Sequence, residues 1–314
     1  MNTASFRGSL VAISAVMSLA FGAEAFSAGA APTGRVQTFR IGSYNAVALS
    51  DGGIQEPNDG KSFVLGQPVS KVAAVLKAAG VPGDHFELSI QPLLVTWDKH
   101  LMLFDTGAGN YFGPMAGALP QSMTTAGVSP ASVTDIFISH AHGDHVGGLI
   151  TAEGKSAFPN ASIHMSAAEW QFLSGMKPED AKNVGISDIT ALVSVIRPKV
   201  VPFQPGAELI PGVVKAVEIK GHTPGHSGYE IGTGKDAVLY IGDSMHSYVT
   251  SVQRPSWKVA FDTDQVTGAA SRVALDKRAA ASGERIYAVH FPFPGLGKIV
   301  QEKGGFVWVP ESIH

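Results

Sequence analysis

Short runs of apolar residues, separated by turns that contain glycine or proline, recur along the chain from about residue 36 onward. Alternating apolar and polar positions predict a first strand from Thr38 to Ser50. Two apolar runs, Leu93–Val95 and Leu101–Phe104, flank Asp98-Lys99-His100 and predict a hairpin. Further strands are expected at 86–90, 135–139, 161–165, 213–219, 237–241 and 285–289.

Three segments have helical periodicity. From Ser70 to Ala79 the apolar residues recur at the spacing of one helix face, and a glycine and a proline then end the pattern. Ser166 predicts the N-cap of a second helix through Trp170, with Glu169 as its capping-box partner. A third helix is expected over about 264–282. Strands with helices between them, in two similar halves, favour an α/β protein.

Two stretches fit this pattern poorly. Residues 108–130 form a long segment rich in glycine, proline and alanine, and loops of this length in compact domains usually carry function. Residues 174–205 are weakly patterned and are expected to form a mobile lobe. No repeat, low-complexity tract or internal linker divides the chain, so one domain is expected over residues 36–314.

The N-terminus has the pattern of a secretory signal. Arg7 supplies a positive charge, the stretch from Leu10 to Ala23 is apolar, and Ala23-Glu24-Ala25 is a small-x-small cleavage site. We therefore expect a signal peptide over 1–25, a flexible leader over 26–35, and a periplasmic or secreted mature protein. The alternative is an uncleaved membrane anchor. No second stretch approaches 18 apolar residues, so stable membrane insertion of the mature protein is not expected.

Charge and composition narrow the candidate functions. The net charge is −3 and the isoelectric point about 6.4, so no basic field suggests a nucleic-acid partner. The chain has no cysteine, which excludes disulfides and thiolate ligands. Any metal site must therefore be built from histidine, aspartate and glutamate. The oligomeric state stays open, with a homodimer as the candidate assembly.

The stretch 139–145, Ser-His-Ala-His-Gly-Asp-His, holds three imidazoles and a carboxylate directly after a buried strand. A solvated loop rarely needs such a set, and a core could not bury it unpaired. Nitrogen and carboxylate ligands in one loop suit Zn²⁺ or a similar transition metal.

Other candidate ligands also lie at or near the ends of predicted strands, and strand ends converge on one edge of a layered sheet. A dinuclear site needs about six or seven ligands and often a shared carboxylate. The seven candidates are His140, His142, Asp144, His145, His226, Asp243 and His290.

The order and spacing of these motifs resemble the metallo-β-lactamase superfamily. The resemblance covers nearly all of the mature chain and implies an αββα sandwich, in which two mixed sheets pack face to face with helices outside. It also implies a ligand assignment: His140, His142 and His226 on a first metal, Asp144, His145 and His290 on a second, and Asp243 bridging both.

Within that superfamily, the last third of the chain resembles the methyl parathion hydrolase and lactonase branch. The runs that carry this resemblance are Gly242–His246, Pro255-Ser256, Phe261–Asp264 and His290–Gly295. Many lactonases of this fold have a tyrosine three residues after the bridging aspartate, whereas this chain has His246. That difference favours phosphotriester hydrolysis, with lactone hydrolysis as a native or side activity.

The implied reaction is hydrolysis of a neutral, apolar ester by a hydroxide held between two divalent metal ions, zinc being the expected metal. Asp144 is expected to take up the proton, and His246 to assist at the leaving group or carbonyl. Phe112, Trp170 and Phe291 are candidates for an apolar substrate pocket. The alternatives are an iron-dependent redox enzyme of the same fold, a thioester or β-lactam hydrolase, and a non-catalytic binding protein.

Two further residues near the motifs have uncertain roles at this stage. His222 lies four residues before His226 and is interpreted as a supporting or structural residue rather than a ligand. Asp105 follows a predicted strand, where it either orients a ligand histidine or caps a turn.

Overall fold

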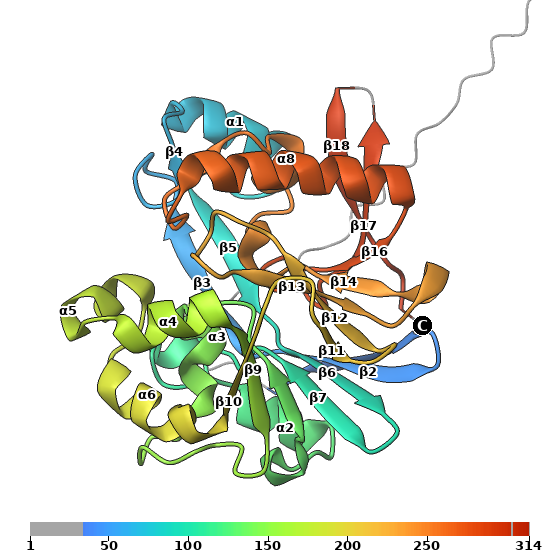
Figure 1. The fold of residues 1–314 in the computed structure, drawn as a ribbon. Helices are drawn as coiled ribbons and strands as arrows, with labels where there is room; N and C mark the ends of the chain where they lie inside the picture. Colours follow the sequence, from blue (N-terminus) through green and yellow to red (C-terminus); the bar gives the residue numbers. More distant parts are fainter. Residues whose placement is uncertain (1–33, 303, 314) are drawn as a thin grey trace, which may run out of the picture.

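The computed structural model describes residues 34–302 and 304–313. The expected signal peptide (1–25) and most of the expected leader (26–35) lie outside the described residues. Two seven-stranded sheets face each other (Figure 1). In spatial order the first consists of β1 (Val36–Ile41), β2 (Tyr44–Leu49), β6 (Leu93–Trp97), β7 (His100–Phe104), β8 (Asp135–Phe137), β9 (Ser162–Ser166) and β10 (Val200–Phe203). The second consists of β11 (Glu208–Ile210), β12 (Val214–Glu218), β13 (Ser227–Ile231), β14 (Val238–Tyr240), β16 (Arg285–Tyr287), β17 (Leu296–Glu302) and β18 (Gly305–Pro310).

The inner faces of the two sheets share one apolar core. Phe104 and Phe137 of the first sheet stack on each other with ring centroids 4.9 Å apart. Both rings also lie 5.6 Å from the ring of Tyr229, which belongs to the second sheet. Because side chains of a strand alternate between its faces, the other face of each sheet is left for the helices.

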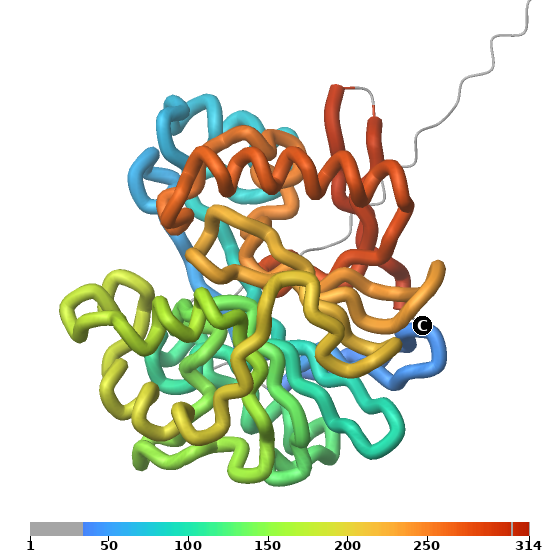
Figure 2. Tube along the Cα trace, in the orientation of Figure 1, coloured from blue at the N-terminus to red at the C-terminus, as the bar shows by residue number. Residues whose placement is uncertain are grey.

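Helices cover both outer faces, and Figure 2 shows the chain passing from the first sheet and its helices to the second. Those beside the first sheet are α2 (Leu119–Thr125), α3 (Gly143–Val146), α4 (Ala167–Gly175), α5 (Pro178–Ala181) and α6 (Ile189–Ile196). Those beside the second are α7 (Thr250–Gln253) and α8 (Gln265–Ser282). The αββα sandwich expected from the sequence is confirmed.

A smaller apolar cluster lies beside the sandwich. It packs α1 (Val69–Ala78) against two short sheets, one made of β3 (Gly52–Pro57) and β5 (His85–Ile90), the other of β4 (Val64–Leu65) and β15 (Lys258–Val259). The expected helix at 70–79 is confirmed to within one residue at each end. This cluster brings the buried ring of Phe63 close to the strand ends where the site lies.

Three sequence-based expectations need correction. The strand expected over 38–50 is a hairpin, because Gly42 adopts a positive φ of 55° and turns the chain between β1 and β2. The long loop contains α2, and Asp51 holds it by accepting hydrogen bonds from the backbone N–H groups of Ala108, Gly117 and Leu119. Residues 174–205, whose weak pattern led to the expectation of a mobile lobe, contain α5, α6 and the edge strand β10.

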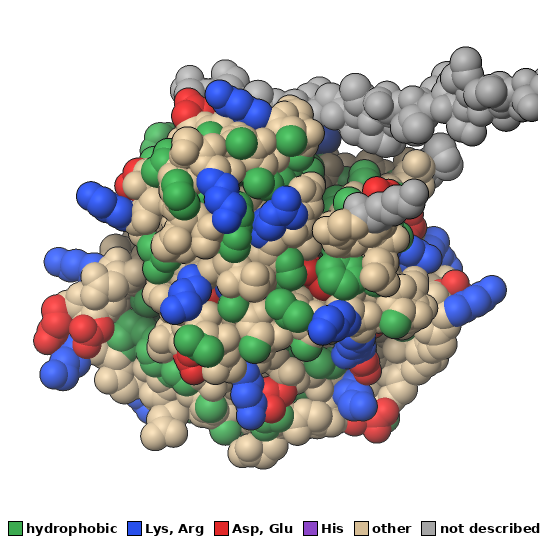
Figure 3. Space-filling view, turned by 90° about the horizontal axis from the view of Figure 1, so that it is seen from above, with side chains coloured by type: hydrophobic (Ala, Val, Ile, Leu, Met, Phe, Trp, Pro, Cys, Tyr) green, Lys and Arg blue, Asp and Glu red, His purple; other side chains and the backbone are tan. Residues whose placement is uncertain are grey.

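Charged side chains are scattered over the face drawn in Figure 3, where lysines and arginines alternate with apolar and neutral residues. This face shows no single basic field, as the net charge of −3 leads one to expect. In the described part of the chain, no helix is long and apolar enough to cross a lipid bilayer.

Helix α8 carries a buried acid that makes the stability depend on pH. Both carboxylate oxygens of Asp276 are buried and have no hydrogen-bond partner among the described residues. Burial raises the pKa of Asp276 to about 8, against a smaller opposing effect of Arg272. The folded state therefore keeps a proton that the unfolded state releases near pH 4, and its stability falls as the pH rises from there through about 8.

We expect Asp276→Asn to remove this pH dependence, because an amide does not titrate. Relative to the variant, the metal-free wild type should lose on the order of 1–3 kcal/mol of unfolding free energy between pH 4.5 and 8.5. Urea denaturation of both metal-free proteins across that range would measure it. A constant difference between the two proteins would contradict the expectation.

Candidate metal centre

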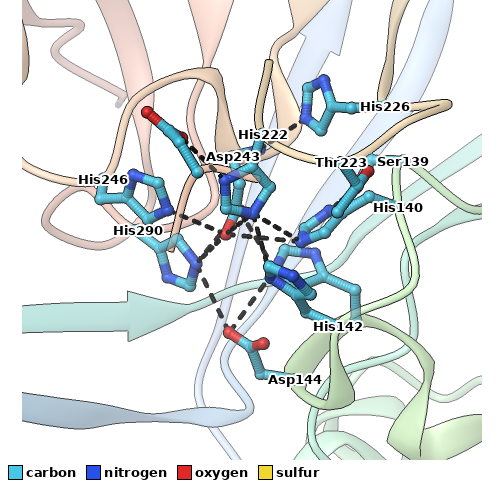
Figure 4. A network of polar contacts seen from close by, with 12 residues as sticks. Ser139, His140, His142, Asp144, His222, Thr223, His226, Asp243, His246 and His290 are labelled. Atoms are coloured by element: carbon cyan, nitrogen blue, oxygen red, sulfur yellow. Dashed lines mark hydrogen bonds and ion pairs between the residues drawn. The ribbon is translucent and has the colours of Figure 1, made fainter. Parts of the chain in front are cut away.

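The polar residues that follow several strands meet at one edge of the sandwich. Asp105 follows β7, the loop 139–145 follows β8, Asp243 follows β14 and His290 lies just beyond β16. Figure 4 shows the imidazoles of the cluster turned toward one another around the carboxylate of Asp243. The expected convergence of these residues at the ends of strands is therefore observed.

The donor atoms fall into two groups, in each of which they lie within 4.8 Å of one another. The first donor group is His140, His142, His222 and Asp243, and the second donor group is Asp144, His145 and His290. The Asp243 carboxylate lies between them. Its Oδ2 is 3.5 Å from His222 Nε2, and its Oδ1 is 3.1 Å from the Nε2 atoms of both His145 and His290. Asp243 is therefore placed to serve both groups.

The chemistry of these groups fits two divalent cations. His145 Nε2 and Asp243 Oδ1 are buried and lie 3.1 Å apart, but neither atom forms a hydrogen bond of suitable geometry in the described structure, a costly arrangement unless something else binds them. Burial, assisted by neighbouring imidazoles, lowers the pKa of His140 and of His142 well below the usual range. Both rings are therefore neutral at neutral pH, the form that binds a metal.

His226, which the sequence analysis assigned to the first metal, belongs to neither donor group, and both of its ring nitrogens form hydrogen bonds with backbone groups. Its Nε2 accepts a hydrogen bond of 3.0 Å from the N–H of Asp243, and its Nδ1 donates to the carbonyl of Ile219, also at 3.0 Å. The ring lies outside the cluster in Figure 4. His222, which the sequence analysis interpreted as supporting, occupies the position in the first donor group.

The strand bounds of the structure agree with this placement. His222 comes soon after the end of β12, whereas His226 directly precedes the start of β13 at Ser227. Once these bounds are known, the rule that ligands stand beyond the C-terminal ends of strands favours His222.

The histidines of the second donor group are held by hydrogen bonds from their other ring nitrogens. His145 Nδ1 donates to Asp105 Oδ2 at 2.8 Å, and His290 Nδ1 donates to the carbonyl of Ser89 at 2.7 Å. Asp105 also accepts from the N–H and hydroxyl of Ser139. It adopts a positive φ of 56°, rare for a residue other than glycine. Of the two roles left open for Asp105, orienting a ligand histidine is the one its contacts show.

His222 is oriented by a buried ion pair that the sequence analysis missed. Its Nδ1 lies 3.1 Å from Asp262 Oδ1, and the other oxygen of Asp262 accepts a 2.7 Å hydrogen bond from Arg272. Arg272 is itself 1% exposed and donates to two backbone carbonyls. The chain from Arg272 through Asp262 fixes the ring of His222, as supporting carboxylates do in metal sites.

The three aromatic candidates for a substrate pocket lie in different parts of the structure. The half-buried ring of Phe112 packs against Gly185 and beside Gly143, next to the ligand loop. The half-buried Trp170 instead packs against the core between the first sheet and its helices, with the guanidinium of Arg197 5.3 Å from its ring centre. Phe291 is fully buried in the core under α8. The structure therefore leaves only Phe112 of the three beside the ligands.

Two other aromatic rings, which sequence analysis did not propose for the pocket, lie beside His246. Phe63 packs edge-on against its imidazole at 5.6 Å, and Phe261 lies 6.5 Å from it. Phe261 is 36% exposed, so it lies where the site meets solvent. Phe63 follows an unpatterned loop, which gave no signal that it would reach the site.

A two-sheet sandwich with paired donor groups at the strand ends defines a class of metal-dependent hydrolases. The profile of the metallo-beta-lactamase superfamily matches residues 89–290, well over half of the chain. The chain belongs to the metallo-β-lactamase superfamily.

Similar proteins agree with this assignment. AidC, described as a dizinc quorum-quenching lactonase in complex with a product N-hexanoyl-L-homoserine, is 31% identical, with a TM-score of 0.83 over 90% of this chain and 99% of that one. The hydrolase AbOPH is 27% identical, with a TM-score of 0.79 over the same shares. Metallo-beta-lactamase domain-containing protein 1 of Xenopus laevis is 30% identical over 131 residues, 40% of this chain and 43% of that protein. The chain thus matches less than half the length of that relative.

Proposed function

We propose that this protein is a dinuclear metal-dependent hydrolase of uncharged, apolar esters. N-acyl-homoserine lactones are the first substrate class and phosphotriesters the second. The observation that carries the proposal is the Asp243 carboxylate, which is shared between two complete donor groups. The likeness to AidC favours the lactones, and the sequence pattern around His246 favours the phosphotriesters.

His140, His142 and His222 would hold one ion, and Asp144, His145 and His290 would hold the other. Asp243 would be shared between the two ions. Two bound divalent ions, which we propose to be zinc, would lower the pKa of water toward neutrality and polarise the oxygen of the scissile group. Burial alone would raise the pKa of Asp144, but His145 and His290 beside it lower the pKa to about 2. Asp144 is therefore a carboxylate at neutral pH and can accept a hydrogen bond.

His246 is the residue best placed to contact the substrate. Both of its ring nitrogens are buried without a hydrogen-bond partner in the described residues, although Nε2 lies 3.3 Å from Asp243 Oδ2. Burial lowers the pKa of His246, so the ring is neutral and offers one donor and one acceptor. We propose that it donates to the carbonyl or leaving-group oxygen, the role of the tyrosine in related lactonases.

The surroundings of the donor groups suit a neutral substrate. The ion pairs of Asp144 and Asp243 among the described residues are all with histidines. The nearby buried cation, Arg272, is already paired with Asp262. Among the described residues, the ion pairs of the donor carboxylates therefore include no lysine or arginine of the kind that binds a carboxylate or phosphate, while Phe112 and Phe261 add apolar surface.

Substrate preference tests this proposal. We expect kcat/KM to decrease from an N-acyl-homoserine lactone to a dialkyl aryl phosphotriester and to be lowest for a β-lactam and a phosphomonoester. Steady-state kinetics of the zinc-loaded protein on these four substrates would measure the order. A preference for the phosphomonoester would contradict the neutral pocket.

Replacement of His246 tests its role separately. His246→Ala should lower kcat by about 100-fold or more if the imidazole assists the reaction, while metal content stays unchanged. Phe261→Ala is the matched control, because it opens the same wall of the site without removing a polar group and should mainly raise KM. Equal kcat values for His246→Ala and wild type would refute the role.

We further propose that the mature protein is exported and begins near Phe26, on the evidence of the N-terminal sequence pattern. Intact-mass spectrometry of the protein from its native host should find the chain without residues 1–25. A soluble form that retains Met1 would contradict export. A homodimer remains a proposal that light scattering would test.

A further inference from the structure

We propose that Glu169 is a positioning residue of the first donor group. Its buried carboxylate ties the loop that carries His140 and His142 to the loop that follows β12. This inference rests on the proposed function and adds a residue to it, because Glu169 belongs to neither donor group and acts through residues beside the ligands.

The contacts of Glu169 reach both loops at once. The side chain is fully buried. Its Oε1 accepts a 2.7 Å hydrogen bond from the N–H of Ala141, which lies between His140 and His142. Its Oε2 accepts from the Thr223 hydroxyl and the Gly225 N–H, both at 2.8 Å. Three donors satisfy a carboxylate that would otherwise be costly to bury.

Helix α4 places this carboxylate by departing from the usual capping box. Ser166 Oγ accepts from the N–H of Glu169 at 3.1 Å, as expected from the sequence. In a capping box the glutamate would reach back to the cap residue. Here Ser166 donates its hydroxyl to the Gly225 carbonyl, and the Glu169 side chain leaves the helix for the loops.

The loop after β12 lies so close to the start of α4 that it needs a glycine. A Cβ atom added to Gly225 would lie 2.2 Å from Glu169 N and 2.3 Å from Ser166 Oγ. Helix and loop are thus held in one arrangement by packing and by hydrogen bonds together.

The two loops joined by Glu169 carry the histidines of the first donor group, so Glu169 affects the distances between their ligand atoms. Thr223 is the neighbour of His222, whose Nε2 lies 3.0 Å from His142 Nδ1 and 3.2 Å from His140 Nε2. The second donor group is oriented instead by Asp105 and the Ser89 carbonyl. Loss of the Glu169 carboxylate should therefore weaken one ion site and leave the other unchanged.

The test is stepwise zinc binding to the full-length mature protein in competition with a chromophoric chelator. Glu169→Gln cannot accept on both sides, because its amide nitrogen is a donor, and should weaken binding of one zinc equivalent about 10- to 100-fold. Thr223→Val should do so to a smaller extent, and Thr223→Ser, which keeps the hydroxyl, should match wild type. If Glu169→Gln does not fold, the threonine pair carries the test.

A double substitution identifies the affected site. In a His222→Ala background, Glu169→Gln or Thr223→Val should cause no further loss at the remaining site, because both substitutions act through the first donor group. Equal weakening of both zinc equivalents, or Thr223→Val binding like Thr223→Ser, would overturn the inference. A wild-type protein that fails to bind two ions would instead refute the proposed function.

Discussion

Asp243→Asn should abolish most of the hydrolytic activity and weaken the binding of both metal ions. The carboxylate faces both donor groups, with Oδ1 3.1 Å from His145 Nε2 and Oδ2 3.5 Å from His222 Nε2. Burial alone would raise the pKa of Asp243, but His145 and His290 hold that pKa well below its usual range. The group is therefore an anion in the folded protein, and an amide cannot replace its charge.

We expect the kcat/KM of Asp243→Asn to fall by more than about 100-fold. That exceeds the loss typical of residues that only support a metal ligand. Elemental analysis after dialysis should find close to two ions per chain in wild type and fewer than one in the variant. Wild type stripped with a chelator and given zinc again should recover activity, and the variant should not. Two tightly held ions in Asp243→Asn would contradict the bridging role, and iron without zinc in wild type would favour redox chemistry.

His222→Ala and His226→Ala should have clearly different effects, although the two residues lie four positions apart. His222 belongs to the first donor group, so its loss should remove one ion and lower activity by more than about 100-fold. The ring nitrogens of His226 form hydrogen bonds only with backbone groups, including the N–H of Asp243, so its loss should cost about 10-fold or less in metal affinity and leave two ions bound.

The two alanine variants are matched controls for each other. Metal content and kcat/KM measured side by side, at a temperature where both proteins are folded, would decide the assignment. Greater metal loss in His226→Ala than in His222→Ala would restore the ligand set implied by the family resemblance. The thermal unfolding midpoint without metal would show whether His226 mainly stabilises the loop.

Local patterns in the chain predicted much of the structure. The helix at 70–79 and the hairpin around Asp98-Lys99-His100 were confirmed, because periodicity of burial and turn residues are encoded within a few positions. The position of the candidate site was also predictable. Strands of one sheet end along a common edge, so polar residues that follow strands come together without further information.

Patterns that look alike in the sequence had different outcomes in the structure. Trp170 and Phe291 were candidates for the pocket, yet Trp170 packs against one core and Phe291 is buried in another. Phe63 and Phe261 reach His246 from distant parts of the chain. Neighbourhood along the sequence is therefore a poor guide to which aromatic rings line a pocket.

The sequence by itself determined the family, the sandwich of strands and helices, and the residue types available to bind metal. Only the tertiary structure decided which histidine of the loop after β12 joins the first donor group. That choice depends on Asp262, 40 residues away, which orients His222, and on backbone groups that occupy both nitrogens of His226. The same holds for Glu169, whose carboxylate satisfies donors from two loops rather than its own helix. Hydrogen bonds between distant segments follow from packing, and no local pattern in the chain records them.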